Sequence, residues 1–156
     1  MSDYEDGYYL FDHDVNHIKS MAEGDGVIFG LSTSGYAGVL ALSVSAGASV
    51  QAGSVYQTAS YASLSIASDG TYPKKAVVYM SGSTITVSQG TASSAIPAGE
   101  TDKYTRVPTP PNPPAGTVIL AEVWIPGGAS AGSECTIFNY SKPLHGGYYT
   151  FDTGEQ

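Results

Sequence analysis

The spacing of apolar and polar positions changes once along this chain, near Gly35. Before that point, residues 12–22 (DHDVNHIKSMA) follow a helical period. Asp12 or Asp14 can cap the first turn, and Gly24 can end the last one. The pattern predicts one short helix with an apolar stripe along it. The residues of that stripe are Phe11, Val15, Ile18 and Ala22.

From Gly35 onward, apolar and polar residues alternate, which is typical of strands with one buried face. About seven short runs follow one another at roughly 8–12-residue spacing, with turns rich in glycine and serine between them. This pattern predicts an all-β fold, a small antiparallel β-sandwich preceded by one short N-terminal helix. The runs cover residues 40–44, 55–56, 62–66, 76–80, 85–87, 117–125 and 136–138.

The longest run, residues 117–125, should form a central strand. Side chains alternate along a strand, so Glu122 and Trp124 are expected on one face. The other face would carry Ile119, Ala121, Val123 and Ile125. Glu122 is the only acid in a predicted core strand, and a semi-buried carboxylate needs a basic partner. The candidates for that partner are Lys75, Lys103 and Arg106.

Trp124 could offer a flat ring for stacking on a sugar. A tryptophan in a central strand is more often part of the core or of a subunit contact, which is the interpretation we prefer. Just before this strand, residues 108–114 (PTPPNPP) contain five prolines. Proline fixes φ at about −65° and donates no backbone hydrogen bond. We therefore expect an extended, rigid connector there rather than a polyproline ligand for a partner.

Composition divides the chain into an N-terminal arm with the helix (residues 1–34), a β-sandwich domain (35–141) and an aromatic tail (142–156). Tyrosine is favoured in interfaces because it is large, stiff and amphipathic, and both ends of the chain are rich in it. The arms should either contact neighbouring molecules or pack on their own domain. The candidate interface residues are Tyr4, Tyr8, Tyr9, Phe11, Tyr148, Tyr149 and Phe151.

Polar residues without charge dominate the composition. Charged residues make up 13% of the chain, against about a quarter in typical domains. The net charge of −8 argues against nucleic acid as a partner, because a phosphate backbone requires a basic face. No stretch reaches the ~20 apolar residues of a membrane-spanning helix, so no membrane span is expected. The acidic N-terminus lacks the basic region of a signal peptide, which indicates synthesis in the cytoplasm.

Signals of catalytic or metal chemistry are weak. His13 and His17 are four residues apart and could hold zinc, but HDVNH carries Asp where the zinc motif HExxH has Glu. No clear third ligand follows, since His145 is the only other histidine. A solvated or interface face of the helix is the simpler interpretation. We expect no catalytic residue, no cofactor and no metal, and Cys135 alone cannot form an internal disulfide. The triplet at Asn139 (NYS) fits a glycosylation sequon that is common by chance.

Four segments together resemble the small β-rich domains of baseplate, receptor-binding and tail-fibre proteins of tailed phages or archaeal tailed viruses. In order, they are FDHDVNHIKSMAEGDGVIFG, GVLALSVSAGASVQAGSVY, YPKKAVVYMSGSTITVSQGTAS and PNPPAGTVILAEVWIPGGAS. The order and spacing of the four carry the resemblance, which covers most of residues 11–138. The chain departs from the family's pattern at Lys75 or Ala76, where an acid is common. It also has TIFNYSKPL where an Asp-Thr-Arg segment is common.

The resemblance implies a non-enzymatic structural protein of the virion, made in the host cytoplasm. Its partners would be further copies of itself, with a homotrimer favoured, and other virion proteins at the tail, baseplate or fibre base. Two alternatives stay open: a capsid decoration or vertex (turret) protein, and a module that binds glycans on the host surface. An exposed Trp124 would favour glycan binding, whereas a buried Trp124 would remove its best residue.

Overall fold

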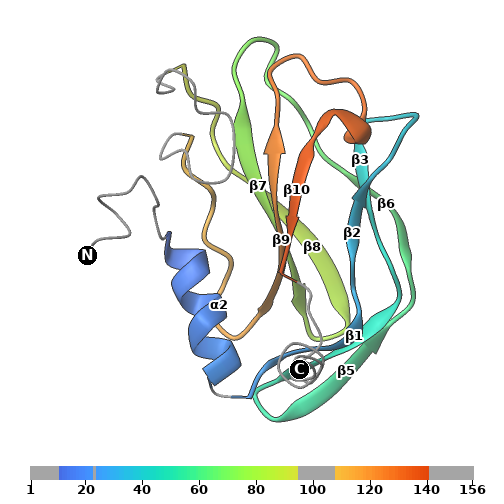
Figure 1. Ribbon diagram of the computed structural model, residues 1–156, viewed down its shortest axis with the longest axis vertical. Helices are drawn as coiled ribbons and strands as arrows, with labels where there is room; N and C mark the ends of the chain where they lie inside the picture. The colour runs from blue at the N-terminus through green and yellow to red at the C-terminus, as the bar shows by residue number, and fades with distance from the viewer. Residues whose placement is uncertain (1–10, 23, 95–107, 141–156) are drawn as a thin grey trace, which may run out of the picture.

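The computed structural model describes residues 11–22, 24–94 and 108–140 of the chain. It confirms the expected all-β sandwich behind one short helix (Figure 1). No helix of the described ranges is long and apolar enough to cross a membrane. The elements are α2 (Asp12–Ala22), β1 (Gly26–Gly30), β2 (Thr33–Gly35), β3 (Ala41–Val44), β4 (Gly47–Gln51), β5 (Ser54–Thr58), β6 (Tyr61–Ser65), β7 (Lys74–Ser81), β8 (Thr84–Gln89), β9 (Val118–Ile125), the 3₁₀ turn η1 (Gly132–Glu134) and β10 (Thr136–Asn139).

The first six strands form two three-stranded sheets that continue into each other at a bend, and together we call them the bent sheet. Strands pair in the orders β1-β4-β5 and β2-β3-β6. Two residues separate β1 from β2, β3 from β4 and β5 from β6. Three chain segments therefore each contribute one strand to either side of the bend. At the bend, the Ser45 amide donates to the Ser32 carbonyl over 3.0 Å. Leu31 adopts φ 60 there and is fully buried, which allows the chain to turn its corner inside the molecule.

The second sheet is four-stranded, with the order β10-β9-β7-β8 and antiparallel pairing throughout. Figure 1 shows it in the middle of the molecule, between α2 on one side and β2, β3 and β6 on the other. Its inner face and the bent sheet enclose the core. The main core residues are Val27, Leu31, Leu42 and Val44 from the bent sheet, and Ala76, Val78, Met80, Val118, Leu120, Ala121, Val123 and Ile125 from the four-stranded sheet.

A bulge in β9 changes which face one side chain occupies. The pairing of β7 with β9 shifts between Val78 and Tyr79, so that Leu120 is left without a direct partner. Leu120 belongs to the core cluster, whereas Ile119 does not, and Ile119 pairs across from Tyr79 instead. The strict alternation that placed Ile119 with Ala121 is therefore wrong at this position, because an extra residue reverses the order of faces beyond it.

The sheets begin at Gly26, nine residues before the alternating pattern starts. Strands β1 and β2 thus lie in the part that composition assigned to the N-terminal arm. Both are short and rich in glycine and serine (GVIFG and TSG), and the bend separates them. Neither strand shows a period of two on its own, although β2 pairs with β3 along its length and β1 pairs with β4 except for a bulge at Ile28.

Cys135, just before β10, is half-buried, and this burial raises the pKa of its thiol to about 11, with Glu134 adding to the shift. At pH 8 the thiolate should then be roughly 100-fold scarcer than in a free cysteine. We expect native protein to react with iodoacetamide slower by a similar factor than protein unfolded in guanidinium. Mass spectrometry of the alkylated chain over time measures both rates, and equal rates would contradict the assigned environment.

Candidate functional site

Asp14 fixes the start of helix α2. The backbone amide of Phe11 donates to Asp14 Oδ2 over 3.1 Å, and the amide of Val15 donates to the carbonyl of Phe11 over 3.1 Å. This is the backward-reaching half of a capping box, in which an acid in the first turn binds the amide before the helix. A carboxylate there also complements the positive end of the helix dipole. Of the two predicted caps, Asp14 is the one that binds the backbone.

Helix α2 packs on the four-stranded sheet through polar residues. His13 is 1% exposed and Asp14 7%, whereas Val15 and Ile18 of the expected apolar stripe are 50% and 57% exposed. The expectation that the histidine face would be solvated or at an interface is wrong for His13. His13 is buried because β9 places Glu122 beneath the first turn of α2, and a buried carboxylate needs hydrogen-bond donors.

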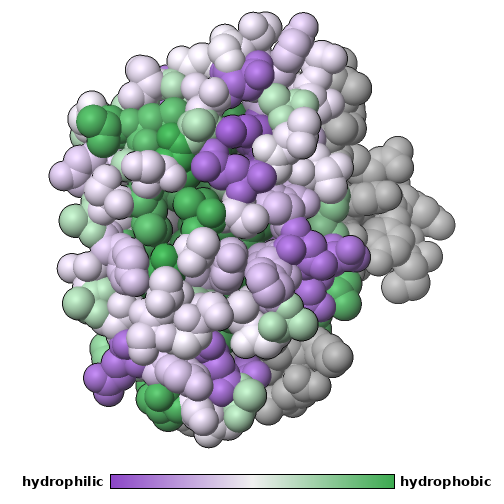
Figure 2. Space-filling model, turned by 180° about the vertical axis from the view of Figure 1, so that it is seen from behind, coloured by the Kyte–Doolittle hydropathy of each residue, from purple (hydrophilic) through white to green (hydrophobic). Residues whose placement is uncertain are grey.

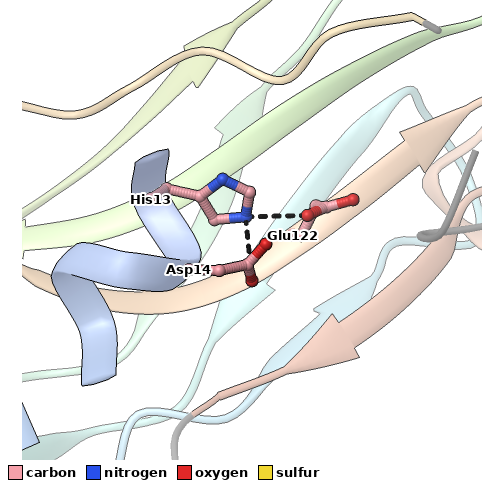
Figure 3. Close-up of side chains that lie close together, drawn as sticks. All are labelled: His13, Asp14 and Glu122. Carbon is pink, nitrogen blue, oxygen red and sulfur yellow. Dashed lines mark hydrogen bonds and ion pairs between the residues drawn. The ribbon is translucent and has the colours of Figure 1, made fainter. Parts of the chain in front are cut away.

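Glu122 joins the helix to the sheet through one oxygen, which faces His13 (Figure 3), and its other oxygen pairs with Lys75 within the sheet. His13 Nε2 lies 2.7 Å from Glu122 Oε1, and Lys75 Nζ lies 3.8 Å from Glu122 Oε2. Lys75 is fully buried, and Glu122 is 1% exposed. The predicted pairing of Glu122 with Lys75 is confirmed. The other candidate partners, Lys103 and Arg106, lie outside the described residues.

Tyr140 completes the network from the end of β10. Its hydroxyl donates to Asp14 Oδ1 over 2.5 Å and lies 3.4 Å from His13 Nε2. The Tyr140 ring stacks on His13 with centroids 6.0 Å apart and meets the ring of His17 at 4.9 Å. Both histidines therefore contact the Tyr140 ring, and His17 does not belong to the group of possible metal ligands around His13.

Phe11 is the one candidate interface residue within the described ranges. Its ring lies 4.8 Å from Lys75 Nζ, a distance at which a cation interacts with an aromatic face, and it stacks near His13 with centroids 6.1 Å apart. Phe11 thus packs on its own domain and covers the buried ammonium. The other candidates, Tyr4, Tyr8, Tyr9, Tyr148, Tyr149 and Phe151, lie outside the described residues.

Three potential metal ligands come together in this network. His13 Nε2, Asp14 Oδ1 and Glu122 Oε1 lie within 4.8 Å of one another, and all three residues are buried. Mixed nitrogen and oxygen donors suit zinc. Two features oppose a cation here. Lys75 already supplies a positive charge to Glu122, and the start of α2 adds the positive end of a helix dipole. The 2.7 Å between His13 and Glu122 is also a hydrogen-bond length, shorter than the roughly 3.3 Å between ligands of tetrahedral zinc.

One nitrogen of His13 stands apart from this network. Nδ1 is buried and has no hydrogen-bond partner within the described part of the chain, and in Figure 3 it points away from both carboxylates. A buried polar atom without a partner costs about 1–3 kcal/mol. Beside His13, α2 and the proline-rich segment border a hollow of about 280 Å³, and Asn16 donates to Asn112 over 3.1 Å across it. The contacts of His13 Nε2 therefore orient the helix, while the burial of Nδ1 lowers the stability of the fold.

Metal removal gives a direct test of this assignment. Because Lys75 and the hydrogen bond from His13 already serve Glu122, we expect zinc or EDTA to move the melting temperature by less than about 1 °C. The His13→Gln variant controls for zinc bound elsewhere. A rise of several degrees with zinc in the unmodified chain, absent from the variant, would instead establish a metal site.

Trp124 lies on the same outer face as Glu122, opposite Lys75 on β7 and Thr136 on β10. It is 7% exposed, so its ring is not a free platform for a sugar. The alternation correctly placed Glu122 and Trp124 together. The sequence did not identify Tyr140 as a partner of Asp14, because these residues are 126 positions apart and no local pattern links them.

No family model, no curated protein and no solved structure matches this chain.

Proposed function

We propose that the chain is a non-enzymatic structural protein of a virus particle, which associates with copies of itself at the tail, baseplate or fibre base. The resemblance of its four sequence segments to such virion proteins motivates the proposal. The structural observation that carries it is the number of large apolar side chains that face solvent on a rigid sandwich. Those that are 43–59% exposed are Val15, Ile18, Phe29, Tyr36, Val39, Val55 and Tyr72.

The character of the surface supports a protein-facing role. In Figure 2 most residues are pale, neither strongly hydrophilic nor strongly hydrophobic, and green hydrophobic residues gather in the left half of the view. Exposed apolar groups that form a contiguous patch mark surfaces that contact other proteins. The sandwich would supply a rigid body, and the tyrosine-rich arms would contact neighbouring molecules.

The buried network is consistent with this role. His13, Asp14, Lys75 and Glu122 are each less than a tenth exposed, so their acid–base groups are enclosed between α2 and β9. The network holds the helix in place on the sheet. A trimer is the assembly that the resemblance favours, and a capsid decoration or vertex protein is the nearest alternative within the same class.

One observation favours the second candidate, a glycan-binding module. A hollow of about 340 Å³ lies over β2, β3 and β6 and is lined by five serines together with Tyr36 and Tyr61. Hydroxyl groups beside aromatic rings suit a sugar, which offers both apolar faces and hydroxyls. A glycan array probed with the unmodified chain and with the Tyr61→Ala variant tests this; binding that the variant loses would support it.

The proposed function is tested on particles. Virus particles purified from the source of this chain should contain it, as detected by mass spectrometry of the particle proteins. Gold-labelled antibodies should bind at the end of the tail if the chain is a tail protein, and over the shell if it is a capsid decoration protein. Particles without the chain, purified from cells that make it, would contradict the proposal.

A further inference from the structure

Charge is distributed very unevenly along this chain. Between Asp25 and Asp69 there is no aspartate, glutamate, lysine, arginine or histidine, and this interval contains all of β1 to β6. Every residue that contributes to the net charge of −8 therefore lies outside the bent sheet. Four of the exposed large apolar residues lie in the same uncharged interval: Phe29 in β1, Val55 in β5, and Tyr36 and Val39 in the loop between β2 and β3. The bent sheet is a neutral, partly apolar region on an acidic protein.

Among the described residues, strand β5 is an open edge of this sheet. It pairs with β4 and stands last in the order β1-β4-β5. The β4–β5 turn has positive φ at Ala52 and Gly53, as in a two-residue type I′ hairpin. In such a hairpin Gln51 and Ser54 form a hydrogen-bonded pair. From there, non-hydrogen-bonded and hydrogen-bonded pairs alternate along the two strands. The amides and carbonyls of Val55 and Gln57 consequently point away from β4, toward the open side.

Proteins normally protect such an edge with a charged residue, most often lysine, or with a proline. The sequence of β5 is SVYQT, which has none of these. Val55 is 59% exposed, and Gln57 is exposed beside it. An edge with outward backbone groups, an apolar side chain and no charge is suited to pairing with another strand.

We propose that β5 pairs antiparallel with β5 of a second copy of this chain, about a two-fold axis at Tyr56. In this register Val55 of one copy faces Gln57 of the other, so all the outward backbone groups of both residues find partners. No like charges meet across the axis, because neither strand has any. The proposal rests on the self-association proposed above, but it gives a two-fold dimer in place of the trimer that the resemblance favours.

The charge distribution is the reason to choose a second copy as the occupant. Two molecules that each carry a net charge of −8 repel one another, and this repulsion is weakest where the charged residues are farthest away. Strand β5 meets this condition along its own length, because it carries no charged residue. The Asp25 carboxylate lies beyond its end, at the β4–β5 turn, where it accepts a hydrogen bond from the Ala52 amide over 3.1 Å. Pairing through β5 would join two three-stranded halves into one continuous sheet, with backbone hydrogen bonds supplying the contact energy.

Sedimentation velocity of four proteins tests the inference: the unmodified chain, Val55→Lys, Gln57→Pro and Val39→Lys. Val55→Lys brings a positive charge from each copy to the axis, and Gln57→Pro removes an outward amide that a single copy does not use. Both should raise the dissociation constant of the dimer at least about tenfold. Val39→Lys is the matched control, because Val39 is 52% exposed in the same neutral region but lies outside β5.

The outcomes separate the two proposals. A dimer that both β5 variants weaken, and that the Val39 variant leaves intact, supports pairing through β5. Two results would overturn the β5 inference but leave self-association in place. The first is an oligomer that both β5 variants still form, and the second is a trimer. A single chain at all concentrations overturns both. Circular dichroism melts of the variants establish that each is folded before its association is measured.

Discussion

Replacing Glu122 by leucine should destabilise the protein by about 3–5 kcal/mol, the usual cost of breaking a buried ion pair from one side. The carboxylate receives His13 at 2.7 Å and Lys75 at 3.8 Å, and both of these residues are at most 1% exposed. Without Glu122, the Lys75 ammonium remains in a site with little access to water. The penalty comes mainly from the buried Lys75 charge losing this carboxylate, rather than from lost packing.

A second substitution distinguishes these two causes. The double variant Lys75→Met with Glu122→Leu removes both members of the pair and replaces them with apolar groups of similar size. Buried pairs replaced in this way often cost little, so we expect the double variant to recover much of the stability lost in the single one. Glu134→Leu is the matched control, because Glu134 is exposed and should change stability by less than about 1 kcal/mol.

Urea unfolding followed by circular dichroism measures all three variants against the unmodified chain. The account requires that Glu122→Leu be much the least stable of them. If the double variant were as unstable as the single one, the network would contribute by packing or by the bond from His13 instead of by charge balance. If Glu122→Leu unfolded at the same urea concentration as the unmodified chain, Glu122 would not be buried as described.

Replacing Gly132 by alanine should also be severe, at about 3 kcal/mol or more, because the added methyl group would meet rigid backbone. A Cβ at Gly132 would lie 1.9 Å from the carbonyl oxygen of Ala41 and 2.6 Å from the amide of Tyr36. Neither atom belongs to a flexible side chain, so relief requires the strands themselves to separate. The Gly132 amide also donates to the carbonyl of Val39 over 2.9 Å. This residue therefore joins the turn before β10 to the bent sheet.

Gly38→Ala and Gly70→Ala are suitable controls, since a Cβ at either position has no heavy atom within 4 Å. Neither glycine has a positive φ, so both substitutions should shift stability by less than about 1 kcal/mol. Thermal and urea melts compare the three variants. A Gly132→Ala protein as stable as these controls would contradict the close packing of the turn against β3.

Local patterns determined what could be predicted from the sequence. The bounds of α2 follow from the caps and the helical period, and the residues of β7, β8 and β9 follow from alternation. The same rule failed at Ile119, because one bulged residue reverses the faces beyond it. It also missed β1, β2 and β4, whose segments contain glycine and serine and are recognisable as strands only from their pairing with neighbouring strands.

The buried network was only partly accessible to the same reasoning. Glu122, an acid in an apolar strand, indicated that a basic partner must exist, and Lys75 is that partner. The role of His13 could not be predicted, because it lies 109 residues from Glu122 and its helix also has an apolar stripe. Periodicity favoured burial of that stripe. The hydrogen bond to Glu122 and the packing of Tyr140 instead turn His13 and Asp14 toward the sheet, which leaves Val15 and Ile18 exposed.

The measurement that most directly tests the central claim is the absolute mass of the complete chain by light scattering behind a sizing column. One chain has a mass of 16.1 kDa. The account predicts a particle of two or more chains whose mass holds across loading concentrations. A mass of one chain at every concentration would contradict it, because a self-associating virion protein must recognise its own copies.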